Sequence, residues 1–274
     1  MIQVQAIKNR RDHYLPRGYL KGFIDASREC KERPLWCFNV KYKSWSQRST
    51  KEIGCSEGFY DYAGSGSGTV ESVFLKLENA YPLICAQMVA DGFKEWAQHL
   101  DLLLSYMQMM TSRSLLFFER MHKIGKNLKV AVVEEVLSDG KVNLSSASSP
   151  PSEDLIRNWS LSQMCEEIMR GAPELLDFDW ALRFCDSPTD PFVVSESPVA
   201  LQGFRQGATL EEAFQHPDSL LYFPLCWQAC LVGSRRPFNV KMERFASDDT
   251  QRCRRMYRES AKLFLISPSK LDNI

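Results

Sequence analysis

The stretch HYLPRGYLKGF at residues 13–23 places a histidine beside tyrosines and an arginine. The imidazole of His13 titrates near neutral pH, which suits a general acid or base. The alternative is structural: a buried ring bonds a backbone carbonyl and anchors the start of the chain over the core. Pro16 stiffens the stretch, and Tyr14 supplies apolar area. Because anchoring would also preorganise the histidine, we treat His13 as a catalytic candidate and Tyr14 and Arg17 as substrate-binding candidates.

Two charged residues lie in segments that are otherwise strongly apolar. Glu78 directly follows Leu77, which belongs to the apolar face of a helical repeat, and Arg113 lies in LDLLLSYMQMMTSRSLLFF. An unpaired charge in such surroundings is costly. We therefore predict a buried pair between Glu78 and Arg113 and keep both as catalytic candidates. A structural pair is the default role, and a solvated helix flank is the alternative position for Glu78.

A third candidate group is the SESP sequence at residues 195–198, where a strand is expected to end in a turn. Glu196 could hold a metal ion with Glu78 or transfer a proton near His13. No G-x-S-x-G elbow surrounds Ser195, so we retain it as a substrate-binding candidate rather than as a nucleophile. The alternative is a turn held by hydrogen bonds between side chains and backbone.

Basic residues gather near both ends of the chain. If the last helix packs beside the first loop, the two groups would merge into a positive rim around His13, which would suit a phosphate-bearing substrate. Otherwise they are solvated faces. The groups are Lys8, Arg10, Arg11 and Arg17, and Arg252, Arg254, Arg255 and Arg258. The glycine-rich AGSGSGT lacks the Lys-Ser/Thr of a P-loop and is interpreted as a connector.

Helical periodicity predicts the elements that must position these residues. Apolar residues repeat at spacings of three and four over 70–84, after a possible cap at Thr69. A second long helix is expected over 97–123, apolar almost all round and therefore central. A further helix precedes a break at Gly171, and a basic helix is expected to end near Ile266.

Strand signals occur at both ends of the chain. LWCFNVKY at 35–42 is followed by a possible hairpin partner, and several short apolar runs joined by Pro- and Ser-bearing turns lie after residue 178. The Ser- and Pro-rich stretch 138–153 is predicted to be an exposed loop inserted into one domain that covers 1–274. The expected class is α+β, with long central helices packed on a small, mostly antiparallel sheet.

Composition narrows the class of protein further. Of 274 residues, 44% are hydrophobic and 25% are charged, and Lys+Arg equals Asp+Glu at 34 each. Any site for a polyanion must then be a local patch, not a net field. The nine cysteines form no C-x-x-C pair and are expected to be free thiols of a reducing compartment. The start of the chain lacks the apolar core of a signal peptide, and no apolar run approaches the ~20 residues of a membrane span. These features predict a cytoplasmic protein without a membrane partner.

The motifs occur in an order that resembles a known family of uncharacterised function, DUF4238. HYLPRGYLKGF resembles its opening signature, and GFYDY, which contains Tyr60, resembles its phenylalanine–tyrosine motif. FLKLENAYP and MMTSR resemble its glutamate- and arginine-bearing helices, and FVVSESPV and YFPLCWQACLVG its Ser-Asp-x-Pro motif and proline–leucine strand. The family usually has aspartate where this chain has Glu196, which is longer by one methylene. The resemblance covers nearly the whole chain and implies no reaction.

Two functions from different classes follow from these residues. In the first, the protein is a phosphodiester-directed hydrolase, a nuclease-like effector such as bacterial toxin or phage-defence systems use. His13 would be the acid or base, Glu78 and Glu196 would hold Mg²⁺ or Mn²⁺, and Arg113 would steady the phosphate. In the second, it is a non-catalytic interaction or regulatory protein whose motifs hold the fold together. The substrate of the first would be nucleic acid or a nucleotide, contacted by Tyr14, Arg17, Tyr60, Ser195, Arg254 and Arg255.

The two functions differ in the geometry that they require. A catalytic site needs His13, Glu78, Arg113 and Glu196 within about one side-chain length of one another, whereas structural motifs can be dispersed.

Overall fold

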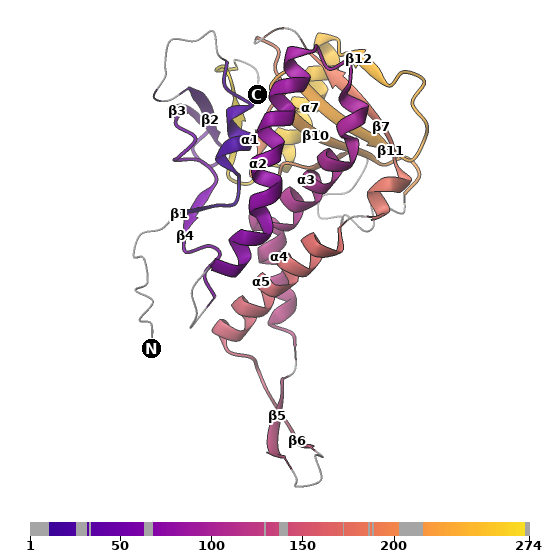
Figure 1. Ribbon diagram of the computed structural model, residues 1–274. Helices are drawn as coiled ribbons and strands as arrows, with labels where there is room; N and C mark the ends of the chain where they lie inside the picture. Colours follow the sequence, from indigo (N-terminus) through magenta and orange to yellow (C-terminus); the bar gives the residue numbers. More distant parts are fainter. Residues whose placement is uncertain are drawn as a thin grey trace.

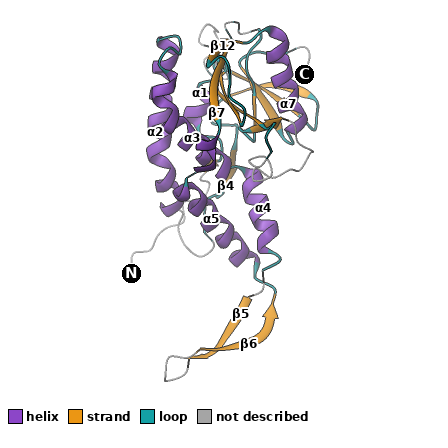
Figure 2. Ribbon diagram, turned by 90° about the vertical axis from the view of Figure 1, so that its right-hand side faces the viewer, coloured by secondary structure: helices purple, strands orange, loops and turns teal. Residues whose placement is uncertain are grey.

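A five-stranded sheet lies at the centre of the computed structural model, between a helical layer and the C-terminal helix (Figures 1 and 2). Its order is β12-β7-β11-β10-β9, and every neighbouring pair is antiparallel except β12 with β7. The strands are β7 (Asp179–Phe184), β9 (Ala200–Gln202), β10 (Leu220–Cys226), β11 (Ala229–Ser234) and β12 (Met242–Arg244). The structure describes residues 11–25, 32, 34–62, 68–128, 130–136, 142–171, 173–185, 187, 189–202 and 216–271.

Both faces of this sheet are covered, which explains why β10 is apolar at nearly every position. Leu221, Phe223 and Leu225 belong to the core shared with the helices, whereas Tyr222 belongs to a second core on the other face. Successive side chains of a strand point to opposite faces, so an unbroken apolar run indicates two buried faces.

The helical layer consists of α1 (Arg17–Lys21), α2 (Gly68–Ala90), α3 (Leu100–Ser112), α4 (Leu115–Gly125) and α5 (Glu153–Arg170), with short 3₁₀ turns at Trp96–His99 and Pro173–Asp177. The α+β class is confirmed, as are the helix over 70–84 and the break at Gly171. Of the AGSGSGT connector, residues 63–67 lie outside the described residues.

The prediction of one unbroken helix over 97–123 is wrong. The chain ends α3 at Ser112 and starts α4 at Leu115, because Ser114 adopts an extended conformation and its hydroxyl accepts from the Phe117 N–H at 3.2 Å. A serine cap of this kind satisfies a backbone donor that a new helix would otherwise leave free. The break turns the chain at Arg113, which becomes the C-cap of α3.

A second sheet joins the two ends of the chain in the order β3-β2-β13-β8. Its strands are β2 (Leu35–Asn39), β3 (Ser44–Arg48), β8 (Val194–Ser195) and β13 (Phe264–Ser267). The hairpin near residue 40 is confirmed. The basic helix α7 (Ser247–Ser260) is shorter than predicted: it ends at Ser260, and Ile266 lies in β13.

Two small ladders complete the structure. β1 (Arg11–His13) pairs with β4 (Cys55–Glu57), and β5 (Val130–Val136) pairs with β6 (Val142–Ser149). The β5–β6 hairpin extends beyond the ends of α4 and α5 (Figures 1 and 2). The prediction of a loop over 138–153 is therefore wrong for 142–149, and residues 137–141 lie outside the described part.

The prediction of free thiols is confirmed for the cysteines that the structure describes, and the reducing compartment stays a prediction. Cys30 lies outside the described residues, and the other eight cysteines carry no disulfide. Within the described residues, no helix combines the length and the apolar character that crossing a membrane requires.

A substitution at Gly54 tests the close contact between the opening stretch, through Leu15, and the segment that precedes β4. Its φ of +62° is unfavourable for other residues, and an added Cβ would lie 2.5 Å from the Leu15 Cβ. Gly92 has a similar φ of +66° with nothing within 4 Å of an added Cβ, so it is a matched control. We expect Gly92→Ala to lower the free energy of unfolding by about 1 kcal/mol and Gly54→Ala by about 2 kcal/mol more. Chemical denaturation measures both, and equal losses would contradict the close contact.

Candidate active site

The opening stretch is anchored by its backbone before any side chain contributes. His13 pairs with Cys55 in the β1–β4 ladder, and the Leu15 N–H donates to the Gly54 carbonyl at 3.1 Å. The neighbouring Asp12 carboxylate accepts from the Tyr60 N–H at 2.9 Å. These bonds hold the His13 Cα in place and leave its ring to be positioned separately.

Arg113 is the centre of the side-chain network. It is 3% exposed, and its guanidinium lies 4.4 Å from the centroid of the Phe74 ring. Its Nε donates to the Tyr60 hydroxyl at 2.9 Å, Nη1 pairs with the Glu78 carboxylate, and Nη2 donates to the His13 backbone carbonyl. The guanidinium therefore joins β1, the segment before α2, α2 itself and the α3–α4 break.

The predicted pair of Glu78 and Arg113 is present, but only its arginine is fully enclosed. The Glu78 side chain is 29% exposed, so it reaches solvent while it holds Arg113. Burial lowers the pKa of Arg113, but Tyr60 and Glu78 raise it by more, so the group stays charged.

Beside this network lies a cavity of about 430 Å³ between the opening stretch and α2. His13, Arg17, Tyr60, Glu78 and Arg113 all line it, so the structure brings five of the predicted site residues together. The lining residues are Arg11, His13, Pro16, Arg17, Gly18, Tyr60, Phe74, Leu75, Glu78, Asn79, Pro82 and Arg113. An added Cβ on Gly18 would lie 2.8 Å from the Pro82 Cγ, so glycine permits the close approach of α1 and α2 that forms one wall.

The His13 ring is held by one nitrogen only. It bonds the Lys51 backbone, whereas Nε2 is buried and has no hydrogen-bond partner within the part of the chain that the structure describes. Donation from Nδ1 to the Lys51 carbonyl leaves the Nε2 lone pair as the acceptor of a neutral imidazole. Burial lowers the pKa of His13, as do the charges of Arg17 and Arg113, while the Lys51 bond and Glu78 oppose them. His13 is thus neutral at pH 7, the state that a general base needs.

Two predicted substrate-binding residues, Tyr60 and Tyr14, differ in their position relative to the cavity. Tyr60 lines the cavity, but its hydroxyl accepts from Arg113 and lies 3.4 Å from the His13 carbonyl; burial, which outweighs Arg113, raises its pKa to about 12. Tyr14 is 6% exposed and packs against Phe59 at 5.7 Å between ring centroids, and it does not line the cavity.

Glu196 and Ser195 do not line the cavity, so the group of four residues that the enzyme hypothesis required is not formed, and only His13, Glu78 and Arg113 of that group meet there. The Glu196 carboxylate is fully buried and accepts from three backbone N–H groups, those of Lys262 at 2.6 Å and of Leu263 and Phe264 at 3.2 Å each. It therefore fixes the turn from α7 into β13. The Ser195 hydroxyl is bound within its own turn, to the Ser197 N–H at 3.1 Å and to the Ser197 carbonyl at 2.9 Å.

The predicted metal site fails for the same reason. The Glu196 oxygens face backbone donors, and Glu78 holds Arg113. Across the described ranges, no three or more His, Cys, Asp or Glu side chains gather in a way that could hold a metal ion.

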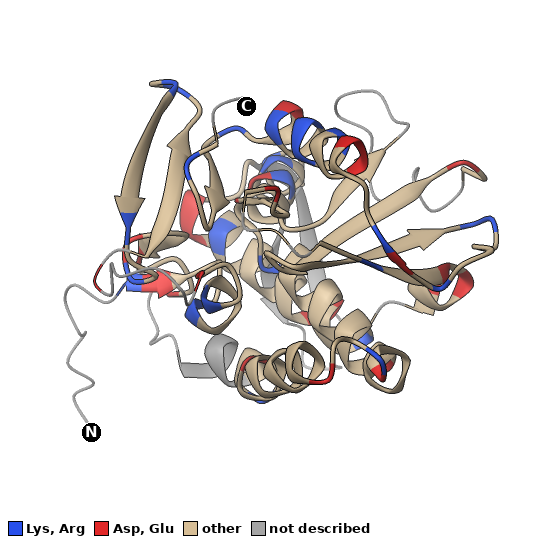
Figure 3. Ribbon diagram, turned by 90° about the horizontal axis from the view of Figure 1, so that it is seen from above, with Lys and Arg blue, Asp and Glu red and all other residues tan. Residues whose placement is uncertain are grey.

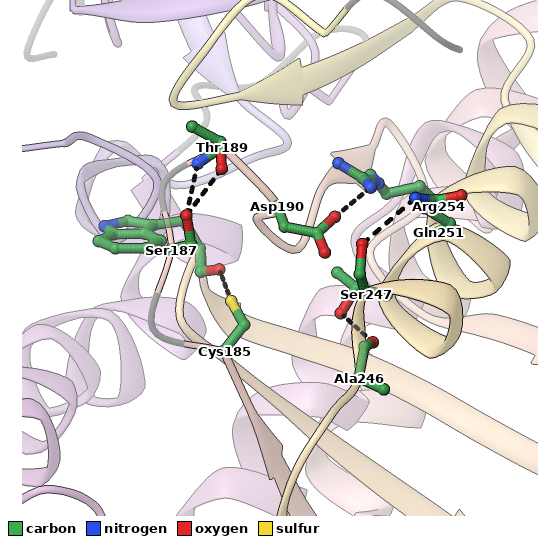
Figure 4. A network of polar contacts seen from close by, with 10 residues as sticks. Cys185, Ser187, Thr189, Asp190, Ala246, Ser247, Gln251 and Arg254 are labelled. Atoms are coloured by element: carbon green, nitrogen blue, oxygen red, sulfur yellow. Dashed lines mark hydrogen bonds and ion pairs between the residues drawn. The ribbon is translucent and has the colours of Figure 1, made fainter.

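The predicted merging of the two basic groups is wrong for α7, because none of its described residues lines the cavity. Of the first group, Lys8 and Arg10 lie outside the described residues, and Arg11 and Arg17 line the cavity. Arg254 is mostly buried and pairs with Asp190, as Figure 4 shows. Arg255 is exposed. Basic and acidic residues are interspersed over the described elements (Figure 3), consistent with a solvated face on α7.

Sequence reasoning missed Lys51 and Asn79. Lys51 acts on His13 through its backbone, which no side-chain pattern reveals. Asn79 follows Glu78 on α2 and lines the cavity, so inspection of the residues beside the predicted ion pair could have found it.

The strength of the central ion pair can be measured by a double-mutant cycle with Glu78→Leu, Arg113→Met and both together. We expect a coupling free energy of about 1–3 kcal/mol, because removing Glu78 alone leaves a buried charge without its counter-ion. Urea denaturation gives the four stabilities, and Glu119→Leu on an exposed position of α4 is the control for loss of a surface carboxylate. An additive cycle would contradict the pairing.

Of the comparisons with known proteins, the one with family models found a match. Comparison with curated proteins and with solved structures found no match. The model of the family described as "Protein of unknown function (DUF4238)" matches residues 11–262. This match spans every residue of the network around Arg113, and the chain belongs to the DUF4238 family.

Proposed function

We propose that the cavity beside Arg113 binds a phosphate-bearing substrate and that the protein is a phosphodiester-directed hydrolase with His13 as its acid–base group. One observation carries the proposal: a buried ring nitrogen, which finds no hydrogen-bond partner among the described residues, belongs to a histidine that lines a cavity together with arginines. A buried polar atom without a partner is unfavourable unless a ligand or a reaction uses it.

The arginines around the cavity differ in how they are held, and both kinds can contribute donors to a bound phosphate. Arg113 is fixed by three partners, which use three of its five N–H donors and leave two. Arg11 and Arg17 are exposed and can close on an anion that enters. Phosphoryl transfer spreads charge over the equatorial phosphate oxygens, and such donors stabilise it.

The proposed reaction uses His13 twice. Its Nε2 accepts a proton from the water that attacks phosphorus, and the imidazolium returns that proton to the leaving oxygen as the P–O ester bond breaks. The lowered pKa of His13 favours the neutral ring that the first step requires. Glu78 holds the Arg113 guanidinium in place during this reaction.

The second candidate, a non-catalytic interaction or regulatory protein, also has support. Tyr60, Ser195 and Glu196 all direct their polar atoms to internal partners. On this account His13 only anchors the opening stretch through Lys51. The two candidates differ in what the free Nε2 of His13 does.

Hydrolysis of bis(p-nitrophenyl) phosphate, with and without Mg²⁺ and Mn²⁺, separates them. We expect His13→Asn to retain the melting temperature, since the amide can still donate to the Lys51 carbonyl, and to lower kcat by about 100-fold or more. Arg17→Gln should mainly raise KM. Arg255→Gln, an exposed arginine on α7, is the matched control and should change neither constant.

Two results would contradict the hydrolase proposal. If wild type is inactive under all three metal conditions, or if folded His13→Asn keeps full activity, the hydrolase proposal is wrong and the non-catalytic function remains.

A further inference from the structure

A second cavity, of about 590 Å³, lies next to the first. Most of its lining comes from α1 and from the segment that precedes β4. The lining residues are Arg17, Lys21, Ile24, Glu32, Pro34, Ser49, Thr50, Lys51 and Glu52. No part of the network around Arg113 uses this space.

The two cavities share a wall that contains the proposed reacting group. Arg17 lines both of them. Lys51 lines the second cavity, and its backbone bonds the His13 ring, which lines the first. Helix α1 and the preceding Pro16 form a ridge between the two cavities. Pro16 and Gly18 line the first cavity. Arg17 and Lys21 both line the second cavity, since residues four apart lie on the same face of a helix.

The charges of the second cavity suit an anion. Arg17, Lys21 and Lys51 are exposed and can extend toward a ligand. The Glu52 carboxylate is held locally, because it accepts from the Ser49 N–H at 2.8 Å and lies 4.0 Å from the Arg48 guanidinium. Glu32 is the other acidic residue among the described lining residues, and it is exposed.

We propose that the second cavity holds the neighbouring nucleotide of a single-stranded nucleic acid whose reacting phosphodiester lies in the first, so that the strand crosses the α1 ridge beneath Arg17. The assignment rests on the proposed function for the identity of the reacting group. Each cavity has the volume of a small-molecule site. A row of cations along two adjoining hollows is the arrangement that tracks a single strand, whereas a paired duplex has no free nucleotide to enter either hollow.

Binding tests the inference independently of catalysis. The probes are fluorescein-labelled phosphorothioate oligothymidylates of increasing length, from one nucleotide upward, measured by fluorescence anisotropy across salt concentrations. For wild type, we expect affinity to rise on passing from one nucleotide to two or three. Lys21→Gln and Lys51→Gln should remove most of that rise, and each should lower the salt-dependence slope by about 0.7, the value for one phosphate contact to a single strand. Lys94→Gln, an exposed lysine that lines neither cavity, is the control.

The failure of this inference and that of the hydrolase proposal give different results. Hydrolysis of bis(p-nitrophenyl) phosphate, which is too small to span both cavities, should be unchanged in Lys21→Gln but lost in His13→Asn. The inference is wrong, whatever the hydrolysis assay shows, if no oligonucleotide binds or if affinity does not grow with length. It is also wrong if the two lysine variants behave like Lys94→Gln, or if a duplex of the same length binds more tightly than the single strand. If length-dependent binding through Lys21 and Lys51 is found without hydrolysis, the second cavity is confirmed as a strand-binding site and only the hydrolase proposal fails.

Discussion

A charged guanidinium buried in an apolar layer is the constraint on which the rest of the structure depends. Arg113 is 3% exposed and can remain there only because its surroundings supply acceptors and aromatic faces. Those acceptors are Tyr60, Glu78 and the His13 carbonyl, which come from segments far apart along the chain. Because the buried guanidinium needs all three acceptors, it determines how β1, the segment before α2 and α2 itself meet at the end of α3.

The same contacts explain why anchoring and a reactive site are compatible. Arg113 and Tyr60 both reach the His13 backbone carbonyl, so the residue is held by its main chain. The ring is oriented by Lys51, and its Nε2 has no hydrogen-bond partner among the described residues. Other buried atoms, such as His99 Nε2 and the Tyr106 hydroxyl, share this lack within the same part of the chain, whereas the Glu196 carboxylate accepts from three N–H donors. His13 differs from His99 and Tyr106 because it lines the cavity that also contains Arg17 and Arg113.

The parts of the fold that local patterns encode could be predicted from the sequence. The apolar repeat over 70–84 predicts α2, and the charges within apolar segments predict the pairing of Glu78 with Arg113. The break between α3 and α4 depends on a single serine cap, which periodicity does not distinguish from a continuing helix. The spacing of apolar residues carries no information about the single hydroxyl that caps α4.

The sequence could not place residues whose partners are distant along the chain. Glu196 was expected near His13, yet its partners are backbone groups some 66 residues away, and backbone donors leave no trace in residue identity. Arg254 lies on a helix that covers the opposite face of the sheet from α2, a choice that depends on how the strands are ordered. The residue types therefore suggested more site residues than the fold places at the cavity.

The central claim is that the fold holds His13 as a neutral imidazole whose buried Nε2 is an acceptor without a partner among the described residues. Nitrogen-15 NMR of selectively labelled histidine tests it most directly, with His13→Asn to assign the signal, because the shifts of the two ring nitrogens report tautomer and protonation together. The account predicts a proton on Nδ1, an unprotonated Nε2 at pH 7, and a pKa below the unperturbed value of about 6.5, because burial first and Arg17 second disfavour the charged ring. A His13 that is already an imidazolium at pH 7, or one that carries its proton on Nε2, would contradict the account.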